Sequence, residues 1–161
     1  MLAVPIGFIY LIIWSFKVAT DPKVRADYNK NIEAYKKIGN VSDLMAFIRQ
    51  VKYVWDGYKG VLDHNNSDYE YFSVGGDCED TAMRAYRKFK ELKIKAGLVL
   101  IFGKETGDVH VDCYYYNGYE YYLVNFGNPV VDISLPKAVS RLWEQVWGKT
   151  LRGFGVVEQN Y

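Results

Sequence analysis

The chain has 161 residues, which is enough for one domain that buries a core of its own. Hydrophobic residues make up 50% of it and charged residues 24%, as in ordinary globular proteins. The formal net charge is +1 and no block of lysine and arginine alternates with aromatic residues, so the usual signature of a nucleic-acid-binding protein is missing.

The chain begins with a long apolar segment. No charged side chain occurs before Lys17. A helix over Leu2–Ala19 would span roughly 27 Å, close to the ~30 Å hydrocarbon thickness of a bilayer. Three interpretations stay open: a membrane anchor, a helix packed within an assembly, and a cleaved signal peptide. We therefore separate residues 1–19, the hydrophobic segment, from a domain over residues 20–161.

The hydrophobic segment favours a membrane-associated protein, either of the cell envelope or of a virion or secretion assembly. The basic residues Lys17, Lys23 and Arg25 follow the segment closely. By the positive-inside rule they would keep the domain in the cytoplasm. The orientation across the membrane is therefore left open.

Two helices are predicted next. Asp21 is a suitable N-cap and Pro22 suits the first helical position, so a helix should begin there and continue to Ile38. Ser42 is expected to cap a second helix with a broad apolar stripe. Residues 57–76 are rich in Gly, Asn, Asp and Ser and predict a long ordered loop, a kind of segment that is often functional.

A third helix is predicted to begin at Cys78. Asp77 is the expected N-cap, and apolar residues recur every three or four positions from the cysteine onward. Gly75 and Gly76 precede this start and permit an unusual turn next to the thiol. The cysteine is therefore expected at the N-terminus of a helix that packs on the core.

The second half of the chain predicts an antiparallel sheet. Residues 98–102 form a short apolar run typical of a buried strand. Val109–Tyr116 and Tyr119–Phe126 are joined by Asn117–Gly118, the strongest short hairpin signal. The later elements expected are a strand over 130–133, a helix over 136–147 and a strand over 154–157. Helices followed by a cysteine helix packed on an antiparallel sheet predict the α+β class.

A thiol nucleophile is the most testable chemistry in this chain, because it has only 2 cysteines and 2 histidines. Unpaired N–H groups at a helix start favour an anion, so we expect a lowered pKa for Cys78. His110, on a predicted strand, would act as its base. Cys113 should face the other side of that strand and is interpreted as a buried structural thiol. His64 is interpreted as a loop residue.

The imidazole needs a third group to orient it. A two-residue turn would place Asn125 opposite His110 across the hairpin, so Asn125 is the predicted partner, with Asp132 as the alternative. No spacing of cysteine and histidine suits zinc, but the acids beside Cys78 could hold a hard cation such as Ca²⁺ through oxygen ligands.

Three segments, GGDCEDTAMRAY, VHVDCYYY and YYLVN, together resemble the bacterial transglutaminase-like cysteine proteinases, the LapG-like family. The resemblance covers roughly residues 65–130. It implies a transglutaminase-like, papain-like core, with Cys78 as nucleophile and His110 as general base. It also implies calcium binding by Asp77 and Glu79, and a location on the periplasmic side of the cell envelope. Asn125 stands where the family usually has aspartate, and asparagine orients the imidazole in papain-like enzymes.

Together these features predict a thiol-dependent amide hydrolase with a Cys78–His110–Asn125 triad. Its substrate would be a protein or a peptidoglycan cross-link, with a membrane contact through residues 2–19, and no nucleic acid. The chemistry requires no organic cofactor, and calcium is the ion implied. The alternative is a degenerate module of the same fold that serves as a membrane-anchored or virion component.

Overall fold

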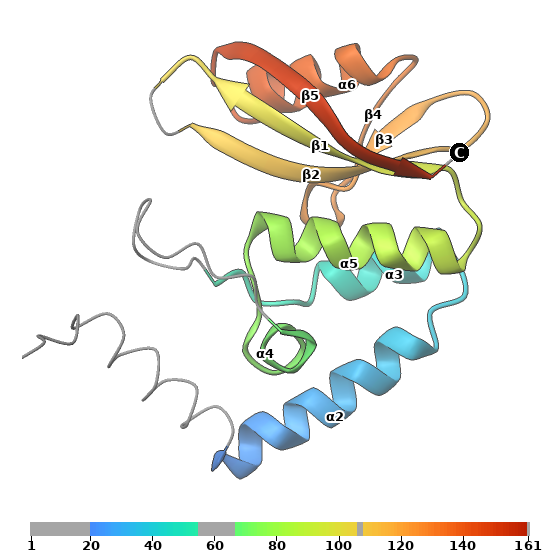
Figure 1. Ribbon diagram of the computed structural model, residues 1–161, viewed down its shortest axis with the longest axis vertical. Coiled ribbons are helices and arrows are strands. Elements are labelled where there is room, and N and C mark those ends of the chain that lie inside the picture. The colour runs from blue at the N-terminus through green and yellow to red at the C-terminus, as the bar shows by residue number, and fades with distance from the viewer. Residues whose placement is uncertain (1–19, 55–66, 106–107, 161) are drawn as a thin grey trace, which may run out of the picture.

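The computed structural model describes residues 20–54, 67–105 and 108–160 (Figure 1). This part combines helices with a five-stranded antiparallel sheet, so the predicted α+β class is confirmed. Within these ranges, no helix is both long and apolar enough to cross a bilayer. The hydrophobic segment over residues 1–19 lies outside the described residues, and its role as an anchor or assembly contact stays a prediction.

The first two described helices differ in how well their starts were predicted. Helix α2 (Pro22–Lys36) begins as expected, because the Asp21 side chain caps its first turn. Helix α3 (Val41–Ile48) is capped by Asn40 rather than by the predicted Ser42, and it is shorter than expected. Both asparagine and serine are good N-caps, so local sequence does not choose between these neighbouring starts.

Two helices surround the glycine pair. Helix α4 (Asp68–Val74) lies where a loop was predicted, and a reciprocal capping box between Ser67 and Glu70 starts it. Helix α5 (Cys78–Glu91) begins at the cysteine as predicted. Asp77 occupies the cap position, but its side chain makes no capping hydrogen bond.

The sheet has the strand order β4-β3-β2-β1-β5. Its strands are β1 (Ala96–Gly103), β2 (Val109–Tyr116), β3 (Tyr121–Leu123), β4 (Val130–Asp132) and β5 (Leu151–Asn160). Because β3 ends early, its pairing with β2 stops at Tyr114. The first half of β2 is therefore paired with β1 and has no strand on its other side within the described residues.

The β2–β3 turn is longer than predicted. Tyr116 pairs with Tyr121, so four residues separate the strands instead of two. The Asn117 side chain explains the longer turn, because its Oδ1 accepts two backbone N–H groups at 2.9 Å. The hairpin register shifts accordingly, and the prediction that Asn125 lies opposite His110 is wrong.

The chain after β3 returns to the sheet through irregular helices. A short 3₁₀ turn, η1 (Asn125–Gly127), precedes β4. The predicted late helix is present as α6 (Leu135–Ser140), which continues into a π-helical segment, η2 (Arg141–Val146). π-Helical turns are uncommon and frequently lie at functional sites.

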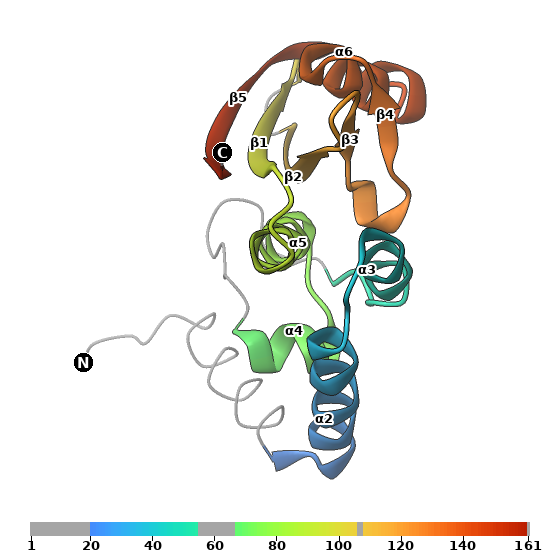
Figure 2. The same ribbon diagram turned by 90° about the vertical axis from the view of Figure 1, so that its right-hand side faces the viewer.

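The molecule is layered (Figure 2). Helix α6 covers one face of the sheet, α5 and α3 lie on the other face, and α4 and α2 lie beyond α5. Two apolar cores result, and alternate residues of β2 enter them: Cys113 and Tyr115 pack on the α5 side, and Tyr114 packs on the α6 side. Strand β2, which carries His110, is thus fixed from both faces.

Candidate active site

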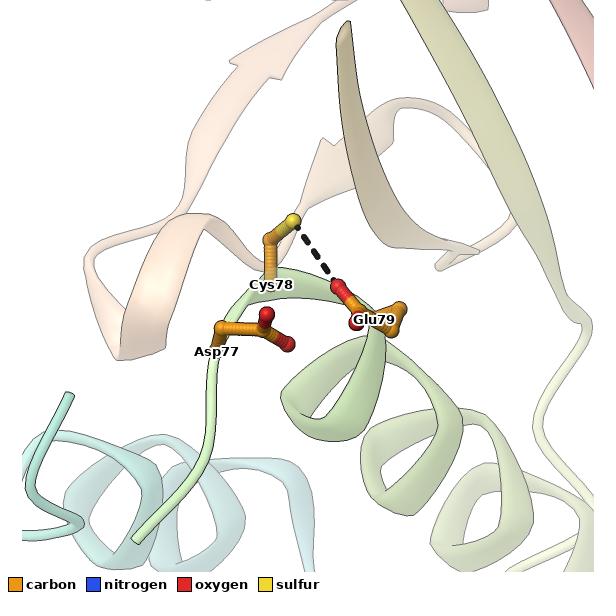
Figure 3. A group of neighbouring side chains, drawn as sticks. All are labelled: Asp77, Cys78 and Glu79. Carbon is orange, nitrogen blue, oxygen red and sulfur yellow. Dashed lines mark hydrogen bonds between the residues drawn. The ribbon is translucent and has the colours of Figure 1, made fainter. Parts of the chain in front are cut away.

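Cys78 is the first residue of α5, and its sulfur is directed away from the helix toward the sheet (Figure 3). The turn before it depends on Gly75, whose φ of +109° belongs to a region that glycine adopts readily. Gly76 forms a parallel β-bridge with Tyr53. The segment around Tyr53 therefore holds the backbone that leads into the cysteine.

Two groups contact the thiol. Its S–H donates to Oε2 of Glu79 at 3.3 Å, and the backbone N–H of Val111 donates to the sulfur. The second contact places Cys78 against β2, next to the residue that follows His110. The structure has no hydrogen bond between the Cys78 sulfur and the His110 ring, both of which it describes.

The pKa of Cys78 is raised to about 12, so the predicted lowering is wrong. Burial is the main cause, and the negative charges of Glu79 and Asp77 add to it, while the Val111 N–H acts in the opposite direction. The helix-start argument considered only the backbone. Desolvation and two acids outweigh that effect here, and the thiol is neutral at pH 7.

His110 is buried on the α6 side of β2. It pairs with Ile101, and its ring packs edge-on against Trp147, with centroids 4.4 Å apart, and against Phe126 at 5.8 Å. Burial lowers the pKa of His110 to about 3, although the Glu79 carboxylate acts to raise it. Within the described residues its Nε2 atom makes no hydrogen bond.

Asp112 is the carboxyl group beside this histidine. It lies two residues further along β2 and therefore on the same face as His110. Its Oδ2 is 4.0 Å from His110 Nε2, about 1 Å too far for a hydrogen bond. Backbone N–H groups of Asn125 and Cys113 donate to the carboxyl. Burial raises the pKa of Asp112 to about 7, against the effect of these donors.

Asn125 contacts this group through its backbone. Its N–H donates to Asp112, whereas its side-chain amide donates to the carbonyl of Asn128 at 3.0 Å. The residue has a φ of +40°, a conformation that asparagine tolerates better than most residues. The structure therefore connects Asn125 to His110 only indirectly, by way of Asp112.

Sequence reasoning missed Asp112, although its spacing from His110 was the available signal, because residues i and i+2 share one face of a strand. The other residues singled out lie elsewhere. Asp132, on β4, accepts the N–H of Ile133. Cys113 is buried in the core and carries a free thiol, as predicted. His64 lies outside the described residues.

The acids on either side of the cysteine converge. Ligand atoms of Asp77, Cys78 and Glu79 all lie within 4.8 Å of one another, close enough to surround one cation. Carboxylate oxygens suit calcium, whereas a thiol does not. The two acids thus fit one side of a calcium site whose other ligands would be carbonyl oxygens and water.

No family model matches the chain, and no curated protein matches it. Among solved structures it is similar to LapG of Legionella pneumophila. The calcium-bound form is 19% identical, with a TM-score of 0.47 over 70% of this chain and 69% of that chain. A second LapG structure is 19% identical, with a TM-score of 0.45 over 68% and 67% of the two chains. These neighbours come from the group that the sequence motifs resemble.

Proposed function

We propose that the chain is a thiol-dependent amide hydrolase that cleaves a bond in a protein or in a peptidoglycan peptide. Cys78 is the nucleophile, His110 the general base, and Asp112 the residue that orients His110. The contact between the Val111 N–H and the Cys78 sulfur carries this proposal, because it brings the thiol to the strand segment on which His110 and Asp112 share one face.

The reaction starts from a neutral thiol and a neutral imidazole. With Nε2 directed at Asp112, the Nδ1 atom of His110 is the nitrogen that accepts the thiol proton. The sulfur then bonds to the substrate carbonyl carbon, while backbone N–H groups at the start of α5 stabilise the oxyanion. Imidazolium protonates the leaving amine as the C–N bond breaks.

Hydrolysis of the acyl-enzyme uses the same residues in reverse. His110 takes a proton from water, the hydroxide oxygen bonds to the thioester carbon, and the C–S bond breaks as the thiol regains its proton. Asp112 steadies the transient imidazolium in both half-reactions. A shift of about 1 Å on substrate binding would bring its carboxyl into hydrogen-bonding range of Nε2, as catalytic contacts often tighten in complexes.

The test compares Asp112 with Asn125 in hydrolysis of an internally quenched peptide library. Cys78→Ala and His110→Ala should lose activity entirely. At pH 8, above the Asp112 pKa of about 7, Asp112→Asn should lower kcat by roughly 10²–10⁴-fold, because the imidazolium loses its counter-charge. Asn125→Gly should retain activity within about threefold, because glycine keeps the left-handed backbone and the N–H that reaches Asp112.

Two outcomes would contradict this assignment. Equal losses in Asn125→Gly and Asp112→Asn would return the orienting role to the Asn125 side chain. Full activity in Cys78→Ala would overturn the thiol mechanism, and absence of activity in the unsubstituted protein would favour the degenerate module.

We also propose that Asp77 and Glu79 hold a calcium ion, since their ligand atoms converge beside the thiol. A bound calcium ion would supply positive charge next to Cys78 and so offset the two carboxylates that raise its pKa. Glu79 also accepts the thiol S–H, so its carboxylate favours the protonated sulfur. Binding of calcium by the carboxylate would remove this effect.

Alkylation of Cys78 by iodoacetamide measures this coupling without any substrate. At pH 8 the isolated protein should react much more slowly than an ordinary cysteine, because its pKa of about 12 leaves little thiolate. Calcium should accelerate labelling by about tenfold, the equivalent of one pKa unit, and EGTA should reverse the effect.

Glu79→Gln should accelerate labelling without calcium and abolish the response to it. The control is Glu33→Gln, which changes an exposed glutamate on α2. Peptide mapping separates Cys78 from the buried Cys113. A labelling rate that is the same in calcium, in EGTA and in Glu79→Gln would argue against both the site and its coupling to the thiol.

A further inference from the structure

A groove of about 380 Å³ lies beside the proposed catalytic residues. Its walls come from the end of α3, the segment that follows it, and η1. The lining residues are Ile48, Arg49, Val51, Tyr53, Phe126 and Asn128. Its volume is within the range of sites that bind small ligands or single side chains of a peptide.

Two aromatic rings connect the wall of the groove to the active site. Phe126 packs against the His110 ring at 5.8 Å and meets the ring of Tyr53 edge-on at 5.3 Å. Tyr53 in turn is bridged to Gly76, two residues before Cys78. The groove therefore lies next to the segments that carry the thiol and the imidazole.

The wall formed by η1 is held in an unusual conformation. Phe126 has a φ of +51°, which is rare for a bulky residue and is typical of functional sites. Gly127 packs so tightly on α3 that a Cβ there would lie 2.5 Å from the carbonyl oxygen of Met45. Arg49 also donates to the Gly127 carbonyl at 3.0 Å. The ring of Phe126 is thus positioned in advance of any ligand.

The lining is mostly apolar, and its polar groups are one cation, one amide and the hydroxyl of Tyr53. Val51, Tyr53 and Phe126 supply apolar surface, and Arg49 supplies positive charge at the exposed rim. None of the six lining residues is acidic. The bond to Gly127 occupies one of the five N–H donors of Arg49, which leaves a planar group suited to a carboxylate.

We infer that this groove is a specificity subsite that takes an aliphatic side chain of an extended peptide, with an adjacent Asp or Glu side chain paired to Arg49. The inference rests on the proposed function for its substrate class, a peptide. It adds the sequence that the peptide must carry near the scissile bond: one aliphatic residue next to one acidic residue.

The test uses the full chain as the Cys78→Ala variant, so that peptides bind without being cleaved. The probe is an array of nonapeptides with every residue type at the central position and Glu, Gln or Lys on either side. Binding should be strongest for Leu, Ile or Val next to Glu. Replacing Glu by Lys should weaken binding roughly 3- to 10-fold, as expected for a charge pair at a rim.

Two further substitutions separate the two halves of the subsite. Arg49→Glu should invert the preference from Glu to Lys, a gain that misfolding does not produce. Tyr53→Ala should lower the preference for aliphatic residues by about tenfold while the preference for Glu persists. Arg152→Glu, which changes an exposed arginine on β5 outside the groove, should alter neither preference.

Cleavage of the same peptides by the unsubstituted protein distinguishes the two proposals. Cleavage with no preference for the aliphatic–acidic pair would keep the hydrolase and overturn the subsite. Binding with the expected preference but no cleavage would support the subsite and overturn the hydrolase. If the Arg49→Glu variant binds peptides with the original preference, the role of Arg49 is overturned. If the protein neither binds nor cleaves the peptides, both proposals are overturned.

Discussion

Alanine at position 75 is expected to lower the free energy of unfolding by roughly 2–6 kcal/mol, the sum of backbone strain and overpacking. Gly75 has a φ of +109°, which disfavours any residue with a Cβ. A Cβ there would also lie 2.0 Å from the carbonyl oxygen of Lys52. That oxygen accepts the N–H of Gly76, so moving it would break the segment that leads to Cys78.

Two other glycines separate the causes of this loss. Gly118 has a similar φ of +104° but open space around its Cα, so Gly118→Ala should cost only the strain, roughly 1–3 kcal/mol. Gly39 has neither feature, and Gly39→Ala should be close to neutral. Urea unfolding of the three variants gives the comparison. A loss in Gly75→Ala no greater than in Gly118→Ala would show that the backbone around Lys52 yields easily.

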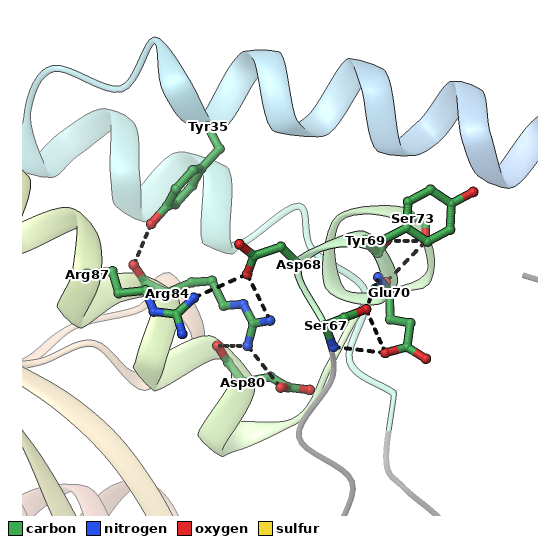
Figure 4. A network of polar contacts seen from close by, with 9 residues as sticks. All are labelled: Tyr35, Ser67, Asp68, Tyr69, Glu70, Ser73, Asp80, Arg84 and Arg87. Carbon is green, nitrogen blue, oxygen red and sulfur yellow. Dashed lines mark hydrogen bonds and ion pairs between the residues drawn. The ribbon is translucent and has the colours of Figure 1, made fainter. Parts of the chain in front are cut away.

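Replacing Arg84 by methionine is expected to lower the free energy of unfolding by about 3–5 kcal/mol, as for other broken buried ion pairs. Arg84 joins α5 to α4, because its guanidinium contacts Asp80 at 3.0 Å and Asp68 at 3.2 Å (Figure 4). Asp80 has no exposed surface. Methionine keeps the apolar stem but leaves the Asp80 charge in the interior without its cation.

The neighbouring Arg87 provides the control for this substitution. It contacts the same Asp68 at 3.3 Å, but both side chains are 53% exposed, so Arg87→Met should cost less than about 1 kcal/mol. The double variant Asp80→Asn with Arg84→Met should recover part of the loss, since it removes the uncompensated charge. Urea unfolding of the double-mutant cycle checks this, and a strictly additive result would mean that the charges do not interact.

Much of the scaffold could be predicted because its signals are local. The Asp21 cap, the start of α5 at Cys78 and the strand over Val109–Tyr116 all follow from residues within one or two turns. Helix α4 was missed because the composition of its surroundings suggested a loop, although its capping box, Ser67 and Glu70, was readable in the sequence.

The candidate site could be predicted only in part, because its geometry depends on contacts that local patterns do not contain. The Asn117 side chain lengthens the hairpin turn, which moves Asn125 away from His110 and gives its N–H to Asp112. The pKa of Cys78 depends on burial by β2 and on Glu79, and the helix-start argument includes neither. Residue identity was therefore easier to infer than pairing or protonation.

The burial of Asp112 beside His110 has a consequence for acid stability. The pKa of Asp112 is raised from 3.8 to about 7, so the folded state keeps a proton that the unfolded state loses, and this contribution to stability falls as pH rises through that interval. The pKa of His110 is lowered from 6.5 to about 3, so its contribution rises with pH. Between about pH 4 and 6.5 these two opposite changes of the free energy of unfolding with pH cancel.

In Asp112→Asn only the His110 contribution to the pH dependence of stability would remain. Relative to the unsubstituted protein, its free energy of unfolding should then increase by up to about 1.4 kcal/mol per pH unit over this interval, as measured by urea unfolding at fixed pH. A difference independent of pH would contradict the cancellation. Over this interval the Asp112–His110 pair thus binds the same number of protons in the folded and the unfolded chain. Folding therefore neither takes up nor releases protons at this pair in a mildly acidic solution.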